Sequence, residues 1–121
     1  MPSSNAKPAK QTPGRRRRRH PRYRDDFRVT LNHLLGNQYE KLEGRCRDLS
    51  IAGIGIILAS ELKSGEVVSL KFLVPGSSAP WDVRAVVRHR RGCQYGFEFL
   101  SLTEEHRVLL ESYLKDKEII D

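Results

Sequence analysis

Two short segments carry side chains that could together bind an anionic ligand. The first, Arg17–Arg22, is rich in arginine and precedes the first apolar segment of the chain. A guanidinium group can bind phosphate through two hydrogen bonds, pair with the O6/N7 edge of guanine, or stack on a base. The second segment offers acceptors in Asp48 and Ser50 for the N–H groups on the other edge of guanine, and Gly53 permits close backbone approach. These residue types favour an anionic molecule that carries guanine.

Patterns typical of enzymes and metal sites are missing from the sequence. It contains no Gly-x-Ser-x-Gly, no HExxH and no cluster of metal-binding side chains, so we expect no catalytic activity and no metal. Cys46 and Cys93 have neither CxxC spacing nor a histidine at ligand spacing, which favours reduced thiols in a cytoplasmic protein. The sequence also predicts no membrane span and no secretory leader.

The net charge of +7 comes from the N-terminal part of the chain. Residues 1–24 hold two lysines, seven arginines and no acidic residue, whereas residues 25–121 hold 13 basic and 15 acidic residues. A near-neutral body with a cationic arm is typical of an arm that closes over something anionic. We interpret residues 1–14 as a disordered tail and residues 15–26 as a mobile, ligand-clamping arm.

Alternating apolar residues predict an all-β domain over residues 27–100. Six short strands joined by turns favour a six-stranded antiparallel barrel, because closure removes exposed strand edges. Gly53 and Gly55 are both interpreted here as residues needed for turn geometry. The side chains expected to point inward are those of Phe27, Val29, Leu31, Val68, Leu70, Phe72, Val83, Val87, Phe97 and Phe99.

A helix is predicted within residues 101–118, from about Thr103 to Lys117. Ser101-Leu102-Thr103-Glu104 has the form of a capping box, with a hydroxyl followed three residues later by a carboxylate. We expect the apolar stripe of this helix to pack on the barrel. The residues at helical spacing on that stripe are His106, Leu109, Leu110, Tyr113 and Leu114.

In these segments the chain resembles the PilZ domains, a family of bacterial receptors for cyclic di-GMP. That family has an RxxxR motif before the first strand and a [D/N]xSxxG motif after the second. Arg18–Arg22 matches the first motif, Arg15–Arg19 offers a second register for it, and Asp48–Gly53 matches the second motif in full. The resemblance covers roughly residues 17 to 115. A run of arginines matches many patterns, but the two motifs together at this separation are specific.

The resemblance implies a PilZ-like barrel whose arm closes over one dinucleotide or an intercalated pair, with Arg17 before the motif favouring the pair. It assigns Gly53 to the second motif as a structural residue of the ligand site. The residues that it implies as ligand contacts are Arg17, Arg18, Arg19, Arg22, Asp48 and Ser50, with His89, Arg90 and Arg91 as further candidates from the later strands.

Cyclic di-GMP is therefore the expected ligand, and an unidentified effector protein the expected partner of a monomer or weak dimer. The alternative is a small nucleic-acid-binding barrel whose basic arm follows the phosphates. The near-neutral body makes that alternative the less favoured one.

Overall fold

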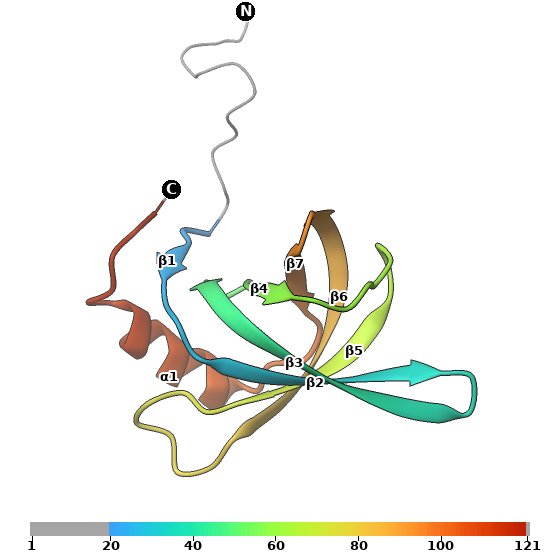
Figure 1. The fold of residues 1–121 in the computed structure, drawn as a ribbon. Coiled ribbons are helices and arrows are strands. Elements are labelled where there is room, and N and C mark those ends of the chain that lie inside the picture. Colours follow the sequence, from blue (N-terminus) through green and yellow to red (C-terminus); the bar gives the residue numbers. More distant parts are fainter. Residues whose placement is uncertain (1–19, 121) are drawn as a thin grey trace, which may run out of the picture.

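The chain forms seven strands and one helix within residues 20–120, the part that this computed structural model describes (Figure 1). The strands are β1 (Tyr23–Arg24), β2 (Arg28–Leu35), β3 (Gln38–Leu49), β4 (Gly53–Leu58), β5 (Val67–Phe72), β6 (Trp81–Arg91) and β7 (Gln94–Phe99). One helix, α1 (Glu104–Leu114), follows them. The predicted tail at residues 1–14 lies outside the described residues.

Six of the strands close into a barrel. Antiparallel neighbours follow the order β3-β2-β5-β6-β7-β4, and β4 also pairs with β3, which closes the ring. The predicted six-stranded antiparallel barrel is therefore confirmed. The short strand β1 was not predicted; it pairs with the end of β3, with Tyr23 opposite Leu49 and Arg24 opposite Asp48. Two residues are too few to show an alternation in the sequence.

The barrel interior is filled with apolar side chains. Of the ten residues predicted to point inward, eight are buried, and Phe27 and Phe99 are partly buried against the same core. These two rings lie at one end of the barrel, where both pack beside Phe72 at centroid distances of 5.5 and 6.4 Å. The interior of this small barrel is therefore filled by its own side chains.

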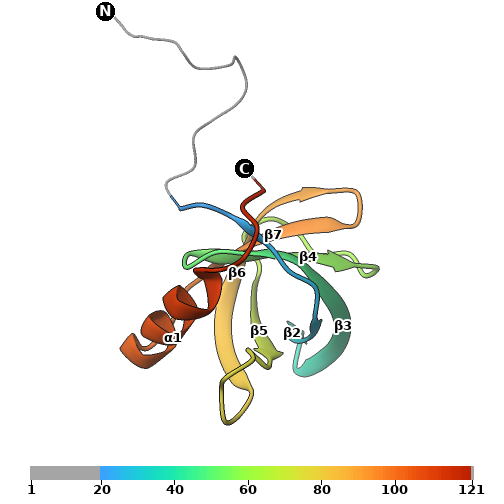
Figure 2. The same cartoon turned by 90° about the vertical axis from the view of Figure 1, so that its left-hand side faces the viewer.

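The helix α1 packs beside the barrel (Figure 2), and its His106 and the neighbouring Trp81 place it at the end that carries Phe72. Leu110 and Leu114 are buried in the core, and the His106 ring stacks on Trp81 at a centroid distance of 4.2 Å. The helix ends at Leu114, three residues before the predicted end.

The predicted capping box at Ser101 and Glu104 is wrong, because the N-cap is Thr103. The Thr103 hydroxyl accepts a hydrogen bond from the His106 amide at 3.0 Å, and the His106 ring accepts one from the Thr103 amide at 3.4 Å. Ser101 lies too early to cap the helix and instead accepts a hydrogen bond from the Arg84 amide on β6 at 3.4 Å.

Thr103→Ala should lower the free energy of unfolding by about 1 kcal/mol, because it leaves an amide of the first helical turn without its acceptor. Ser101→Ala, which removes only a long hydrogen bond, should lower it by clearly less. Urea denaturation of both variants measures the difference. Equal losses of unfolding free energy in the two variants would contradict the assignment of Thr103 as the N-cap.

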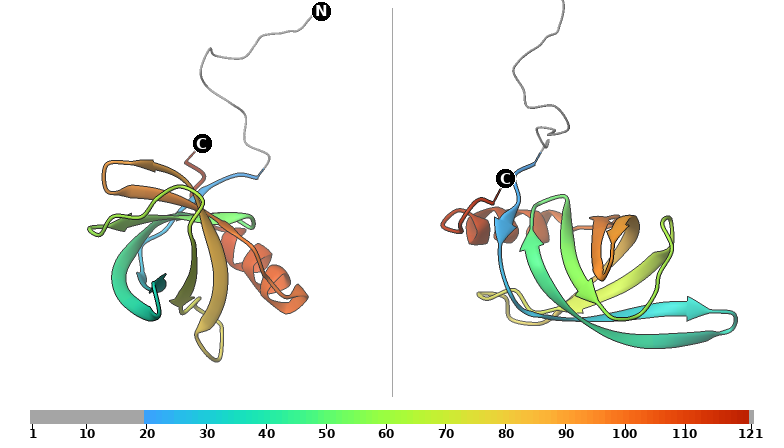
Figure 3. Two further views of the ribbon diagram at one scale, coloured as in Figure 1. Left: turned by 90° about the vertical axis from the view of Figure 1, so that its right-hand side faces the viewer. Right: turned by 45° about the horizontal axis from the view of Figure 1, so that its top comes forward.

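The chain beyond α1 returns to β1 (Figures 1 and 3). The Arg24 amide donates to the Glu118 carbonyl at 2.9 Å, the Ile120 amide donates to the Arg22 carbonyl at 3.0 Å, and Tyr23 forms a β-bridge with Ile119. Residues 22–24, at the end of the predicted arm, therefore lie between β3 and this C-terminal segment.

Asp25, which follows β1, is also held from the helix side. It accepts a hydrogen bond from the Tyr113 hydroxyl at 2.7 Å and lies 3.6 Å from the Lys117 ammonium group. Burial, followed by the hydrogen bond to Asp25, raises the pKa of Tyr113. These contacts join the last residues of the arm to the helix.

At the opposite end of the barrel, a buried histidine pairs with a partly exposed glutamate. His33 on β2 is 5% exposed, and its Nε2 lies 2.9 Å from a Glu66 carboxylate oxygen. The other oxygen of Glu66 accepts a hydrogen bond from the Lys63 amide at 2.6 Å. That bond is the main cause that lowers the pKa of Glu66 below its ordinary value, and His33 lowers it further.

The lowered pKa makes Glu66 a source of acid sensitivity. A carboxyl with a depressed folded-state pKa contributes stability above its unfolded-state pKa, and this contribution is lost as the pH falls through the folded-state value. We therefore expect wild type to lose more unfolding free energy than Glu66→Gln as the pH falls below about 4.5. Denaturation at a series of pH values checks this, and parallel pH profiles would contradict it.

Candidate ligand-binding face

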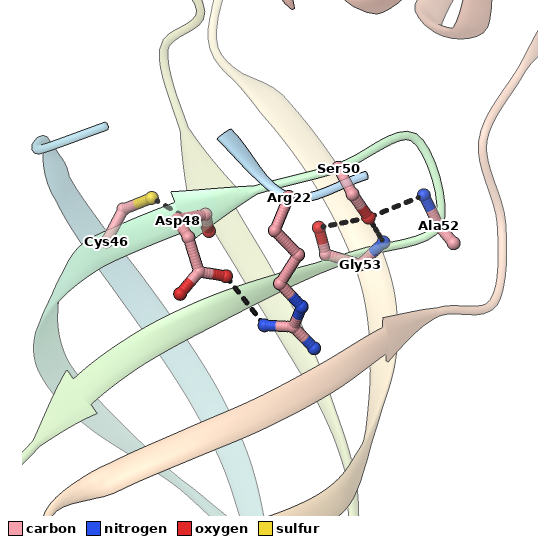
Figure 4. A network of polar contacts seen from close by, with 6 residues as sticks. All are labelled: Arg22, Cys46, Asp48, Ser50, Ala52 and Gly53. Carbon is pink, nitrogen blue, oxygen red and sulfur yellow. Dashed lines mark hydrogen bonds and ion pairs between the residues drawn. The ribbon is translucent and has the colours of Figure 1, made fainter. Parts of the chain in front are cut away.

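The turn between β3 and β4 contains the second motif, and its serine holds the turn together (Figure 4). The Ser50 amide donates to the Gly53 carbonyl at 2.9 Å. The Ser50 hydroxyl accepts hydrogen bonds from the amides of Ala52 and Gly53, both at 3.1 Å. Ser50 is 7% exposed. Its hydroxyl thus already serves the backbone of its own turn, a common use of serine at such positions.

Gly53 allows β4 to lie close to β7. A Cβ atom at this position would overlap the backbone carbonyl oxygen of Phe97. Gly53 is the first residue of β4 and pairs with Glu98, so it serves strand contact and not the turn geometry inferred from the sequence.

Asp48 faces outward because β3 contains a β-bulge. Side chains two residues apart in a strand share a face, so Asp48 would point inward with the buried Cys46 in a regular strand. The register shifts between Cys46 and Asp48, so that Asp48 pairs with Gly55 and the following Leu49 is buried. The extra residue, Arg47, turns the motif carboxylate to the outer face.

Cys46 itself is a core residue. It is 2% exposed, and its thiol donates to the Asp48 carbonyl at 3.4 Å. Burial, followed by the carboxylates of Asp25 and Asp48, raises the pKa of this thiol. A protonated, buried thiol is a poor nucleophile.

The two motifs meet in an ion pair between Arg22 and Asp48. The Arg22 guanidinium donates to the Asp48 carboxylate at 2.6 Å, and their side chains are 20% and 15% exposed (Figure 4). The pairing of β1 with the end of β3 positions Arg22, because Arg22 directly precedes β1. Each group thus neutralises the other's charge at a partly exposed position.

Asp48 begins a row of outward-facing residues that crosses four strands. Asp48 pairs with Gly55 on β4, Gly55 with Gly96 on β7, and Gly96 with His89 on β6. A second register shift, between Val87 and His89, turns the His89 side chain outward in the same way as Asp48. We call Asp48, Gly55, Gly96 and His89 the glycine row.

The side chains at the two ends of the glycine row lie over its glycines. A Cβ atom at Gly55 would lie 2.7 and 2.8 Å from the two Asp48 carboxylate oxygens, and one at Gly96 would overlap the His89 ring. Both glycines are buried although they face outward.

Gly55 and Gly96 were not among the predicted site residues, and Gly55 is a strand residue, not a turn residue. Glycine at outward positions within alternating strands was the signal that could have identified them.

The remaining predicted site residues divide between faces. Arg90, next to His89, points to the other side, where its guanidinium donates to Glu61 at 3.1 Å and to the Gly92 carbonyl at 2.8 Å. The ion pair with Glu61 raises the pKa of Arg90. Arg91 pairs with Gln94, is exposed, and shares the face of His89.

Arg17, Arg18 and Arg19 lie outside the described residues. Within residues 20–120, no three His, Cys, Asp or Glu side chains gather as a metal-binding group. In the same part of the chain, no helix has the length and apolar character needed to cross a membrane.

The family model described as PilZ domain matches residues 16–116. No curated protein matches the sequence.

Among solved structures, the PilZ domain of YcgR from Escherichia coli with c-di-GMP is similar, with a TM-score of 0.63 and 18% identity over 84% of this chain and 92% of that one. The PilZ domain of CeSA from a cellulose-synthesizing bacterium has a TM-score of 0.59 and 14% identity over 78% of this chain and 94% of that one.

The inhibitor of motility from Bacillus subtilis has a TM-score of 0.65 and 19% identity over 83% of this chain. The chain spans 50% of that protein's length. At these identities the structural similarities establish the fold.

Proposed function

The chain belongs to the PilZ domain family, and on that premise we propose that it is a receptor for cyclic di-GMP, which it binds on the outer face of its barrel. The observation that carries the proposal is the ion pair between Arg22 and Asp48, because it brings the two motifs within 2.6 Å of each other. Cyclic di-GMP offers what both groups need, namely phosphate or the O6/N7 edge for the guanidinium and guanine N–H donors for the carboxylate.

Binding then exchanges one set of charge-assisted hydrogen bonds for another. Arg22 leaves Asp48 for a phosphate or for the O6/N7 edge of a guanine, and the Asp48 carboxylate accepts from the N1–H and N2–H groups of a guanine. Because neither group is left without a partner, the desolvation cost of breaking the ion pair is offset within the complex. In this proposal Arg18 binds with Arg22, and Arg17 or Arg19 assists.

Ser50 and Gly53 support the site in different ways. The Ser50 hydroxyl organises the turn that follows Asp48 by accepting from the amides of Ala52 and Gly53 and donating to the Gly53 carbonyl at 3.4 Å. In this proposal it contacts a guanine by exchanging one of these bonds for a bond to the base. Gly53 keeps β4 against β7 and so holds the register of the glycine row. Arg91 is a further candidate for a phosphate contact because it shares the face of His89.

We also propose that the bound state is recognised by an effector protein. Arg22 is one residue away from β1, and β1 is bonded to both β3 and the C-terminal segment. A change of partner at Arg22 therefore acts on a strand that contacts the rest of the domain on two sides. The surface that an effector would read is the arm together with the outer face of the barrel.

Isothermal titration calorimetry with cyclic di-GMP tests the function. We expect saturable binding, with one or two ligands per chain, that outcompetes GTP and single-stranded RNA at equal concentration. Binding that is equal for all three and falls steeply with salt would indicate an arm that merely collects phosphates, and it would contradict the receptor function.

A further inference from the structure

Asp25 is a buried carboxylate close in sequence to Arg22, from which it is separated only by the two residues of β1. Its side chain is 8% exposed, whereas that of the neighbouring Asp26 is 70% exposed. Removing a carboxylate from water costs stability unless hydrogen bonds and opposite charges replace the water. A buried carboxylate at this place in the chain therefore indicates a specific role.

The backbone of Asp25 contacts one half of the candidate site. Its amide donates to the Arg47 carbonyl at 3.0 Å, and Arg47 is the bulge residue directly before Asp48. This hydrogen bond extends the contact between β1 and β3, which otherwise consists of two residue pairs. Two pairs alone hold a strand weakly, because segments with few buried contacts open locally at a small cost in free energy. The positions of β1 and Arg22 therefore depend on further contacts.

The helix α1 supplies these contacts through the side chain of Asp25. The carboxylate accepts a hydrogen bond from the Tyr113 hydroxyl at 2.7 Å and lies 3.6 Å from the Lys117 ammonium group. That ammonium group lies over the Tyr113 ring at 4.5 Å from its centroid. The chain that follows Lys117 then bonds to the backbone of Arg22 and Arg24 (Figure 1). The C-terminal end of α1 is thus joined to the chain on both sides of β1.

We propose that Asp25 is a positioning residue of the ligand site. Anchored by Tyr113, it holds β1 in place and keeps Arg22 beside Asp48. This inference rests on the proposed function and adds α1 as the element that sets the affinity of the arm. Ordering a segment costs backbone entropy for every residue, so an arm that is already anchored loses less on binding than a free one. If the anchored arrangement is populated only in part, the apparent affinity falls by the same fraction.

A second explanation assigns the same contacts to stability alone. The bond between Asp25 and Tyr113 would then only fasten the end of α1 to the barrel. In that case its loss would act like any other loss of helix stability, and ligand affinity would not follow it. If Asp25 positions Arg22, loss of the bond lowers affinity, and it does so only while Arg22 is present.

Tyr113→Phe removes the hydroxyl that binds Asp25 and keeps the packed ring. In calorimetric titrations with cyclic di-GMP, this variant should bind about 3- to 10-fold more weakly than wild type, the change that corresponds to the loss of one hydrogen bond. Thr103→Ala is the matched control, because it weakens α1 at its other end and should leave affinity unchanged. Equal affinities of Tyr113→Phe and wild type would overturn the positioning role and leave the receptor function intact.

An Arg22→Ala background gives a readout that a purely structural role does not move. Because the anchor acts through Arg22, adding Tyr113→Phe to Arg22→Ala should lower affinity by less than about 2-fold. A loss in this background as large as in wild type would contradict the proposal.

Hydrogen exchange of the ligand-free protein tests the anchor without the ligand. The Asp25 amide, bonded to the Arg47 carbonyl, should exchange faster in Tyr113→Phe than in wild type and at the wild-type rate in Thr103→Ala. Unchanged exchange of this amide in Tyr113→Phe would contradict the anchor. Absence of any binding of cyclic di-GMP by wild type would remove the proposed function, and the positioning role with it, whatever the exchange rates are.

Discussion

Asp48→Ala should weaken cyclic di-GMP binding about 10- to 100-fold although it makes the protein more positive. The carboxylate is the proposed acceptor for guanine N–H groups, and charge-assisted hydrogen bonds of this kind contribute about 1.5–3 kcal/mol. Its removal also frees Arg22 from the 2.6 Å ion pair, which by itself would favour an anion. The predicted direction therefore separates base recognition from simple attraction of phosphates. Calorimetric titration at two salt concentrations gives the affinities.

Asp26→Ala is the matched control. This variant also removes one negative charge. Asp26 follows β1 in the sequence, and its exposed carboxylate pairs with Arg45 at 2.6 Å. Its affinity should equal or slightly exceed that of wild type. Arg22→Ala should lose binding in the same range as Asp48→Ala, and the double variant should lose less than the two losses combined, because the two residues share one ligand and one ion pair. Tighter binding by Asp48→Ala would refute the receptor proposal.

Gly53→Ala should lower the free energy of unfolding by about 3 kcal/mol, the upper part of the range for overpacked interiors. The reason is the backbone carbonyl of Phe97, which occupies the place of the new methyl group and cannot rotate away as a side chain could. The overlap with the new methyl group can be removed only if β4 and β7 move apart. Urea denaturation of the ligand-free protein measures the loss.

Gly36→Ala provides a comparison with the opposite geometry. Gly36 has open space around its missing Cβ but a φ of +60°, so alanine there should cost only about 1 kcal/mol of backbone strain. If Gly53→Ala is as stable as Gly36→Ala and still loses the ligand, the motif glycine contacts the ligand directly and its structural role is wrong.

The strands that alternate strictly were predictable from the sequence, because burial on one face of a strand leaves a period of two. Val29, Leu31, Leu70 and Phe97 carry that period and are all buried. The strand β1 was not predictable, since it exists through pairing with β3 and the C-terminal segment. The N-cap was misplaced by two residues because Ser101 and Thr103 offer the same hydroxyl group, and in the fold Ser101 accepts from the Arg84 amide while Thr103 accepts from the His106 amide.

The candidate site was predictable as far as its motifs, and the meeting of Arg22 with Asp48 agrees with them. The glycine row was not predictable from the sequence, because it depends on two β-bulges that bring Asp48 and His89 to the outer face. A bulge is a property of two paired strands, and a single strand's sequence does not show it. The same shift explains why Arg90, one residue from His89, contacts Glu61 on the opposite side.

Alternate residues of the same strands form the core and the candidate site: Gly55 lies between Ile54 and Ile56, and Gly96 between Tyr95 and Phe97. One substitution therefore changes either the interior or the outer face, and seldom both. Over evolutionary time, such a barrel can exchange the chemistry of its surface while its folding information stays in place. A lineage that loses the glycine row keeps a stable domain. That domain is then free to acquire another ligand or to become a pure adaptor.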